Sequence, residues 1–462
     1  MWKLSLIVIP VVLLYASQYT QTNQLLNIVR KQYDLDIAAV SWLLSVEPLC
    51  AMMLVIWTQH FISKFGVPQV LLFSLFIFSV SCLSIVFVMR QFYLLVLVRV
   101  FQSIGAALML TSCIPFTFLF CEPEKVASFI SIISLVIPLG QVLISFALWL
   151  FCSVSSWQYL NFMLGCIALC LIILSFVLVP YRFVPKRPIL QAKQYGLLLL
   201  VSGLITTRLA VEMFPVNVIL FGCLLALGVV LLASFLFLNA KKETYRLFGA
   251  TNIGTQVQRY QAIIVMSSIL HYSELLILSQ MLTDVLKYDQ TAVCVTYAVC
   301  NCISIFCSPI INLVSKRMLS KTSTLMFTGI FAASVCFNMI QIILFNNVYG
   351  YVAFVFITTF CNLGVQSVLQ TTIFAQNPDN YIPLISTINQ FSLHFGNFLG
   401  VGIFSLVINT IHDKIVNIKE IIISYICLSG ISIIMVVLTV ILFARKKNNI
   451  SSPQETEMRL QE

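Results

Sequence analysis

Long, continuous apolar runs constrain this chain more than any other feature. From Leu4 to Phe443, stretches of about 20 apolar residues recur with only short polar breaks between them, and roughly 20 such residues let an α-helix cross the hydrocarbon of a bilayer. The runs do not alternate between polar and apolar residues as the strands of a membrane barrel do. Because a helix satisfies its own backbone hydrogen bonds in lipid, the sequence predicts an all-α, polytopic membrane protein.

Composition points to the same class. Hydrophobic residues make up 60% of the chain and charged residues 9%, which is too little charge for the surface of a water-soluble fold. The net charge of +10 does not indicate a nucleic-acid partner, because the basic residues lie in the short breaks and form no patch with aromatic residues. We expect the lipid bilayer, a small-molecule substrate and protons as partners, no nucleic acid, and a monomeric protein.

The pattern predicts about fourteen transmembrane helices. The predicted spans are Leu4–Asn27, Ala39–Ser63, Val67–Val88, Phe92–Leu119, Val126–Phe151, Trp157–Val179, Tyr195–Met213, Val216–Leu238, Gln261–Thr283, Thr291–Val314, Thr322–Phe345, Tyr349–Ala375, Ile382–Thr410 and Ile421–Phe443.

The distribution of loop charge predicts the orientation. With a cytoplasmic N-terminus, the outer loops hold only the following Lys and Arg residues: Arg30, Lys31, Arg90, Lys287, Lys414 and Lys419. All other loop Lys and Arg residues then lie inside, as the positive-inside rule requires. Both termini are therefore expected in the cytoplasm, and a bacterial cytoplasmic (inner) membrane is the expected location.

Two polar connections divide the spans into six, two and six. The segments Tyr181–Gln194 and Lys241–Tyr260 bracket spans seven and eight. We expect an N-terminal six-helix bundle at 1–180, a linker with two extra transmembrane helices at 181–260 and a C-terminal six-helix bundle at 261–443. Residues 444–462 are polar and are expected to form a disordered cytoplasmic tail.

No cofactor or metal site is predicted. The fifteen cysteines are scattered through apolar runs without a Cys-x-x-Cys pair, so small packing residues are the favoured reading. No Walker loop, dinucleotide fingerprint or nucleophile elbow occurs. The energy for any transport must then come from a gradient.

Charged residues inside the predicted spans are the candidates for function, since burying a charge in a bilayer is costly. Arg99 lies in the fourth span and should face a polar cavity or a partner, although it could instead brace helices through backbone carbonyls. Glu47, in the second span beside Pro48, could take and release a proton because burial disfavours a carboxylate anion. The alternative for Glu47 is an idle, hydrated position near the outer end.

A second pair of ionisable residues lies on the ninth span. His271 and Glu274 are three residues apart and share a helix face, so they could form a proton relay or a structural hydrogen bond between helices. Arg208 and Glu212, four apart on the seventh span, can neutralise each other. Since this span belongs to the inserted pair, we favour a structural role for them.

Uncharged polar residues and glycines mark the last spans. Two readings fit the uncharged polar residues of these spans equally well: they line a cavity, or they form hydrogen bonds that hold neighbouring helices together. These residues are Gln366, Gln370, Asn389 and Gln390. In span thirteen His394 precedes Gly396 and Gly400, whose spacing indicates close helix packing.

The segment Arg99–Ala107 resembles the fourth-span motif Arg-x-x-Gln-Gly-x-Gly-Ala-Ala of the major facilitator superfamily, and only Ser103 departs from it. The six-two-six layout resembles the fourteen-span drug:proton antiporter branch. This resemblance implies two six-helix bundles that rock about a central site, with Gln18, Asn23 and Gln102 as candidate cavity residues and Gly105 as part of the structural motif.

Other positions match that branch in part. Thr20, Asn23 and Trp42 match its first two spans, while Gln18 stands where an Asp is usual and Asn27 where a Pro is usual. Gly66 matches the loop after the second span, Trp157 the start of the sixth, and Pro138 and Gly140 match part of the fifth-span motif.

The leading hypothesis is a secondary transporter that exports a small amphipathic molecule in a proton-coupled cycle, and not an enzyme. An importer or facilitator of a metabolite, or an exporter of an endogenous product such as a siderophore, is the alternative that the missing Asp at Gln18 favours. A membrane-embedded transferase needs clustered carboxylates or histidines, which are scattered here. Nothing resembles the pore loop of a channel.

Overall fold

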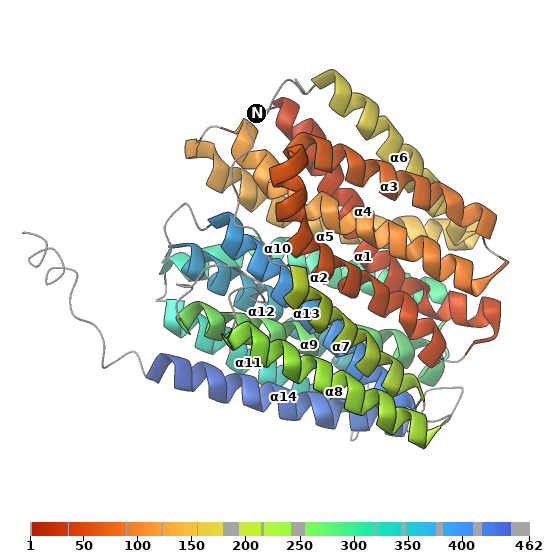
Figure 1. Ribbon diagram of the computed structural model, residues 1–462. Coiled ribbons are helices and arrows are strands. Elements are labelled where there is room, and N and C mark those ends of the chain that lie inside the picture. The colour runs from red at the N-terminus through yellow and green to blue at the C-terminus, as the bar shows by residue number, and fades with distance from the viewer. Residues whose placement is uncertain are drawn as a thin grey trace, which may run out of the picture.

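The structure is a computed structural model, and it describes residues 2–35, 37–88, 90–121, 123–154, 156–178, 194–213, 217–241, 255–317, 320–342, 348–375, 382–409 and 418–444. The described part of the chain is helical throughout and holds fourteen α-helices (Figure 1). They are α1 Trp2–Tyr33, α2 Ile37–Phe65, α3 Val67–Val88, α4 Phe92–Phe120, α5 Pro123–Val154, α6 Trp157–Leu178, α7 Gln194–Met213, α8 Val218–Lys241, α9 Thr255–Gln280, α10 Gln290–Arg317, α11 Ser320–Ile340, α12 Val348–Ala375, α13 Ile382–Asn409 and α14 Ile418–Ala444. Each predicted span falls on one of these helices, so the predicted helix pattern is confirmed.

Eleven helical stretches in the described residues are long and apolar enough to cross a membrane, and two shorter apolar stretches lie at Leu198–Val211 in α7 and Val355–Gln370 in α12. The protein is therefore a multi-pass membrane protein. Fourteen crossings remain part of the proposal below. The connecting segment before α7, most of the one before α9, and the predicted tail from residue 445 lie outside the described residues.

The helices pack in two groups. In the N-half, α1–α6, α4 contacts α1, α2 and α3, and α6 packs on α3. In the C-half, α9–α14, α9 packs on α12, α13 and α14, and α11 packs on α12 and α14. The two halves meet along α2 with α13 and α5 with α10, while α1 contacts α9 and α10 between these seams. Figure 1 shows the N-half in red to yellow above the C-half in green to blue.

Local chemistry explains where the chain turns. After α2, Gly66 has a φ of +95°, a conformation that glycine adopts without a Cβ clash, and its N–H donates to the Ile62 carbonyl at 2.9 Å. Pro68 then lies in the first turn of α3, where its missing N–H costs no helical bond. At the end of α9, a π-helical turn, η2 (Met281–Val285), widens the helix; such turns are frequent at functional sites.

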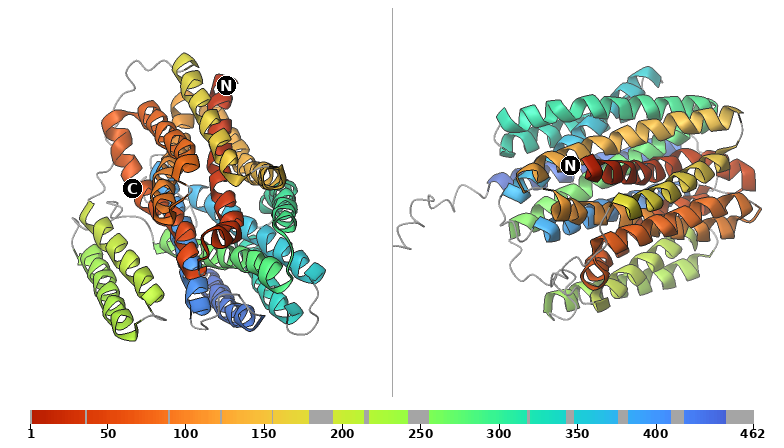
Figure 2. Two further views of the ribbon diagram at one scale, coloured as in Figure 1. Left: turned by 90° about the vertical axis from the view of Figure 1, so that its right-hand side faces the viewer. Right: turned by 90° about the horizontal axis from the view of Figure 1, so that it is seen from above.

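The inserted pair α7–α8 lies to one side of both halves (Figure 2, left). α7 contacts α8, α13 and α2, while α8 is largely exposed and strongly apolar. The inserted pair therefore rests, through α7, on the seam between α2 and α13.

Candidate functional site

Arg99 lies at the centre of a hydrogen-bonded network inside the N-half. It is 3% exposed, and its Nη1 donates to Gln18 Oε1 of α1 at 3.1 Å and to Gln102 Oε1 at 2.9 Å. The amide of Gln102 in turn donates to Asn161 Oδ1 at 3.3 Å. Two neutral amides therefore hold the guanidinium, one from α1 and one from α4 itself.

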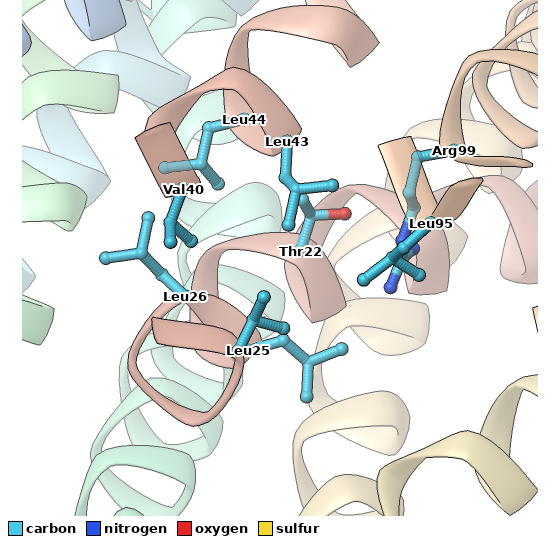
Figure 3. Close-up of a pocket in the computed structure, with 9 residues that line it drawn as sticks. Thr22, Leu25, Leu26, Val40, Leu43, Leu44, Leu95 and Arg99 are labelled. Atoms are coloured by element: carbon cyan, nitrogen blue, oxygen red, sulfur yellow. The ribbon is translucent and has the colours of Figure 1, made fainter. Parts of the chain in front are cut away.

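A small cavity lies beside Arg99 (Figure 3). Thr22 of α1 lines it with Arg99, and its remaining walls are aliphatic side chains of α1, α2 and α4. Its volume of about 10 Å³ is roughly that of one probe sphere, the minimum that a single water needs. It is too small for a substrate.

Glu47 lies on α2 and is 3% exposed. Neither carboxyl oxygen has a hydrogen bond of standard geometry within the described part of the chain, although the Thr22 side chain lies close enough to interact with it. Arg99 is close enough to interact with it electrostatically, and the phenols of Tyr15, Tyr19 and Tyr272 also lie within its electrostatic range. The side chain is buried and therefore does not take the hydrated position of the alternative reading.

Two tyrosines and two asparagines join the halves, and we call them the tyrosine layer: Tyr19, Asn23, Tyr272 and Asn397. The rings of Tyr19 on α1 and Tyr272 on α9 lie 5.6 Å apart. Asn397 of α13 donates to the Tyr19 hydroxyl at 3.1 Å, and the Tyr272 hydroxyl donates to Asn23 Oδ1 at 3.0 Å. This tyrosine layer combines apolar ring faces with amide groups from both halves. The structure thus places Asn23, a predicted cavity residue, on the interface.

An ion pair closes one end of that interface. We call the end at which α1 stops the Tyr33 end. There Arg30 donates to Asp284 of η2 through Nη1 at 2.8 Å and Nη2 at 2.6 Å. Asn27 of α1 donates to Thr283 Oγ1 at 2.8 Å and to Ser279 Oγ at 3.2 Å. These bonds hold the two halves together at the Tyr33 end.

Sequence reasoning missed this pair. The loop-charge pattern assigns Arg30 to an outer loop. In the structure both side chains are buried, with Arg30 9% exposed and Asp284 6% exposed. The available signal was an Arg and an Asp at the same predicted end of the first and ninth spans, but only the packing of α1 on α9 brings them together.

His271 and Glu274, the pair predicted as a proton relay or a structural hydrogen bond, lie one turn apart on α9. Within the described residues, no hydrogen bond joins them, and His271 Nδ1 is buried without a partner. Glu274 is 1% exposed and accepts a hydrogen bond from the Asn338 amide of α11. Glu274 thus takes part in a hydrogen bond between α9 and α11, the alternative that the sequence left open for this pair.

The remaining predicted polar residues lie in the C-half. Asn389 accepts from the Gln261 amide of α9, and Gln366 donates to Asn362 of its own helix at 3.2 Å. Gln370 and Gln390 are half-buried. His394 is 1% exposed, and its two ring nitrogens have no partner in the described part of the chain.

The predicted structural glycines mark close helix contacts. A Cβ on Gly105 would lie 2.7 Å from the Phe78 backbone nitrogen, and one on Gly396 would lie 2.5 Å from the Val265 carbonyl oxygen. Gly400 similarly faces the Ile269 carbonyl, and Gly140 faces Ala16 two residues after the buried Pro138 in α5. These contacts explain the small residues without a ligand.

Comparison with known families decides the identity of the fold. Residues 7–401 match the family model described as Major Facilitator Superfamily. The chain belongs to the major facilitator superfamily. No curated protein sequence matches it.

Solved structures of other transporters share this superfamily fold. A D-xylose-proton symporter has a TM-score of 0.65 and 13% identity, covering 95% of this chain and 97% of the other. A mutant of the nucleoside transporter NupG has a TM-score of 0.64 and 13% identity, with 96% and 99% covered. The POT family transporter PepTSo has a TM-score of 0.69 and 11% identity, with 97% and 99% covered. At these identities the likeness extends to the fold alone.

Proposed function

We propose that this superfamily member is a proton-coupled secondary transporter that exports a small amphipathic molecule by alternating access. The N-half and C-half rock about the tyrosine layer. The chain crosses a bacterial inner membrane fourteen times as a monomer, with both termini cytoplasmic, as in the drug:proton antiporter branch. The Tyr33 end is then the outer end, closed in the present state.

The observation that carries this proposal is the environment of Glu47. Gln18 occupies the first-span position at which the antiporter branch has an Asp, and it cannot titrate. Glu47 is a carboxyl buried in the same half, unpaired among the described residues and within electrostatic range of Arg99. Burial disfavours the anion and the nearby cation favours it, so a change of environment between two states can load and unload a proton.

The tyrosine layer supports an amphipathic substrate. The ring faces of Tyr19 and Tyr272 offer apolar contact. The side-chain amides of Asn23 and Asn397, which now bind the tyrosine hydroxyls, offer hydrogen-bond donors and acceptors. A ligand pocket of this kind is mostly apolar with a few placed polar groups. Since the layer takes residues from both halves, substrate bound there would sense their relative motion.

Proton flux in proteoliposomes tests the proposal. A pH-sensitive dye inside the vesicles reports proton movement while lipophilic cations, anionic metabolites, sugars and nucleosides are offered in turn. Proton movement that requires one of these substrates is the expected result. No substrate-dependent proton movement with any of them, in protein that retains its fold, would contradict proton coupling.

A facilitator or importer of a metabolite is the second candidate. The absence of a first-span carboxyl at Gln18 favours it, and two of the structural neighbours are titled as a D-xylose-proton symporter and a nucleoside transporter. Counterflow of a labelled sugar or nucleoside without proton movement would select this candidate.

A further inference from the structure

The inserted helix α7 carries a buried arginine to the seam between the two halves. Arg208 is 2% exposed. Its Nε donates to Ser45 Oγ of α2 at 3.1 Å, and its Nη2 donates to Ser41 of α2 and to Ser405 Oγ of α13 at 3.3 Å. Its guanidinium also lies over the Trp42 ring, 5.3 Å from the centroid. One side chain from outside both halves thus binds both of them.

The seam itself is closed at this point. Ser405 Oγ donates directly to Ser41 Oγ at 3.1 Å, so α2 and α13 touch at the Tyr33 end. A separate hydrophobic cluster continues the contact toward the other end and includes Met52 and Ile56 of α2, Leu200 and Leu204 of α7, Phe235 of α8 and Phe398 of α13. The α7–α8 pair is therefore docked on the seam by apolar packing as well as by Arg208.

Alternating access requires α2 and α13 to part at the Tyr33 end when the substrate site opens there. Arg208 cannot then keep all three serines. Two of them, with Trp42, belong to α2, and only Ser405 belongs to α13. The single bond to α13 is the one that opening must break, while the bonds to α2 can persist.

We propose that Arg208 is a positioning residue that latches the inserted pair α7–α8 across the α2–α13 seam and favours the state closed at the Tyr33 end. The proposal rests on alternating access in the proposed function, but on neither its substrate nor its coupling ion. It gives the two inserted helices a role that a six-plus-six bundle lacks: they travel with α2 and release α13 on opening. The cost of burying a guanidinium in the membrane is offset by hydroxyl partners and the Trp42 ring.

Hydrogen exchange followed by mass spectrometry tests the latch on the full-length protein in nanodiscs, without any substrate. The readout is the exchange of amides 37–47 of α2 and 399–409 of α13. Arg208→Ala should speed exchange at both segments, with the ratio of open to closed states rising about tenfold, the worth of one charge-assisted hydrogen bond. Ser405→Ala should act in the same direction and leave α7 amides protected. The matched control is Arg90→Ala, at an exposed arginine between α3 and α4.

A second variant should shift the equilibrium toward the state that is closed at the Tyr33 end. Ser405→Asp places a carboxylate where Arg208 already donates, so a stronger charge-assisted pair forms across the seam. Exchange at 399–409 should slow, and turnover of a transported substrate should fall severalfold. Since Ser405→Asp leaves the arginine in place and strengthens only its charge-assisted bond, it tests the latch even where Arg208→Ala does not fold. Ser405→Ala alone does not, because it also removes the Ser41–Ser405 bond.

Two results would overturn the latch. One is unchanged exchange in Ser405→Ala and in folded Arg208→Ala. The other is faster exchange in Ser405→Ala but not in Arg208→Ala, which would assign the closure to the Ser41–Ser405 bond alone. Failure of the proposed function looks different, because the parent would then show no proton flux while the exchange changes persist.

Discussion

Arg30 and Asp284 form a two-pronged ion pair between α1 and η2, with nitrogen–oxygen distances of 2.8 and 2.6 Å. The pair is buried, and it belongs to opposite halves of the protein. Its partners include Gln280, whose Oε1 lies 3.4 Å from Arg30 Nη1. Any state that opens the Tyr33 end must break this pair.

Stability measurements should show that Arg30 and Asp284 act as one unit. Removing one member of a buried pair leaves an uncompensated charge and costs about 3–5 kcal/mol, whereas replacing both is often nearly neutral. Arg30→Met and Asp284→Leu should each lower the melting temperature in detergent, and the double variant should recover most of the loss. Additive losses in the double variant would contradict the pair.

Arg99 should be required for transport but not for insertion. Arg99→Ala removes the donor that Gln18 and Gln102 share and should abolish flux, while Arg99→Lys keeps a charge but loses the planar fork that reaches both amides. Vesicle uptake at matched expression is the measurement, with Arg90→Ala as the control. Parental flux in well-inserted Arg99→Ala would rule out a transport role.

Among the described residues, Glu47 and Glu274 are buried carboxyls outside the Arg30–Asp284 ion pair, so we expect one of them to carry the proton of the proposed function. Glu47→Gln keeps the shape of the side chain and removes titration, so substrate exchange should persist while proton-driven accumulation is lost. Glu274→Gln should have the smaller effect, because Glu274 accepts from Asn338 inside the C-half. Asp289→Asn, at an exposed acid that caps α10 through the Ala292 N–H, is the control. Unchanged accumulation in both glutamine variants and in their double would refute the assignment.

Two glycines of α13 should differ sharply in their tolerance of a methyl group. Gly396→Ala brings a Cβ within 2.5 Å of the Val265 carbonyl oxygen, and such overpacking costs about 1–3 kcal/mol. Nothing lies within 4 Å of a Cβ on Gly402, so Gly402→Ala should be neutral or gain up to about 1 kcal/mol of helix propensity. Thermal unfolding in detergent compares them. Equal melting temperatures would show that α9 and α13 are not packed this closely.

Reporter fusions check the membrane topology. Fusions after Lys193 and Lys321 should report the cytoplasm and a fusion near Asn347 the outside, because the loop charges favour that orientation. An external signal at Lys193 would exclude the fourteen-span arrangement.

The positions of the helices were accessible from the sequence, because each apolar run is local and long enough to specify its own helix. The role of α7 was not accessible from the sequence. The spacing of Arg208 and Glu212 predicts that they neutralise each other, and the Glu212 side chain lies outside the described residues. What the spacing could not indicate is that Arg208 also binds serines of α2 and α13. A shared helix face likewise allows His271 and Glu274 to meet, but it could not indicate that Asn338 of a neighbouring helix donates to the Glu274 carboxyl.

The sequence by itself determined that this is an all-helical membrane protein, that its predicted spans contain charged residues such as Arg99 and Glu47, and that the Arg99–Ala107 segment resembles one superfamily. Hydrophobicity and helix periodicity are properties of neighbouring residues, so they can be read without coordinates. Only the tertiary structure decided that Arg30 meets Asp284, that Tyr19 meets Tyr272 and that Arg208 spans a seam. Each of these contacts joins residues separated by well over a hundred positions. These contacts depend on which helix faces pack together. That packing is determined jointly by the small, polar and apolar residues of several spans.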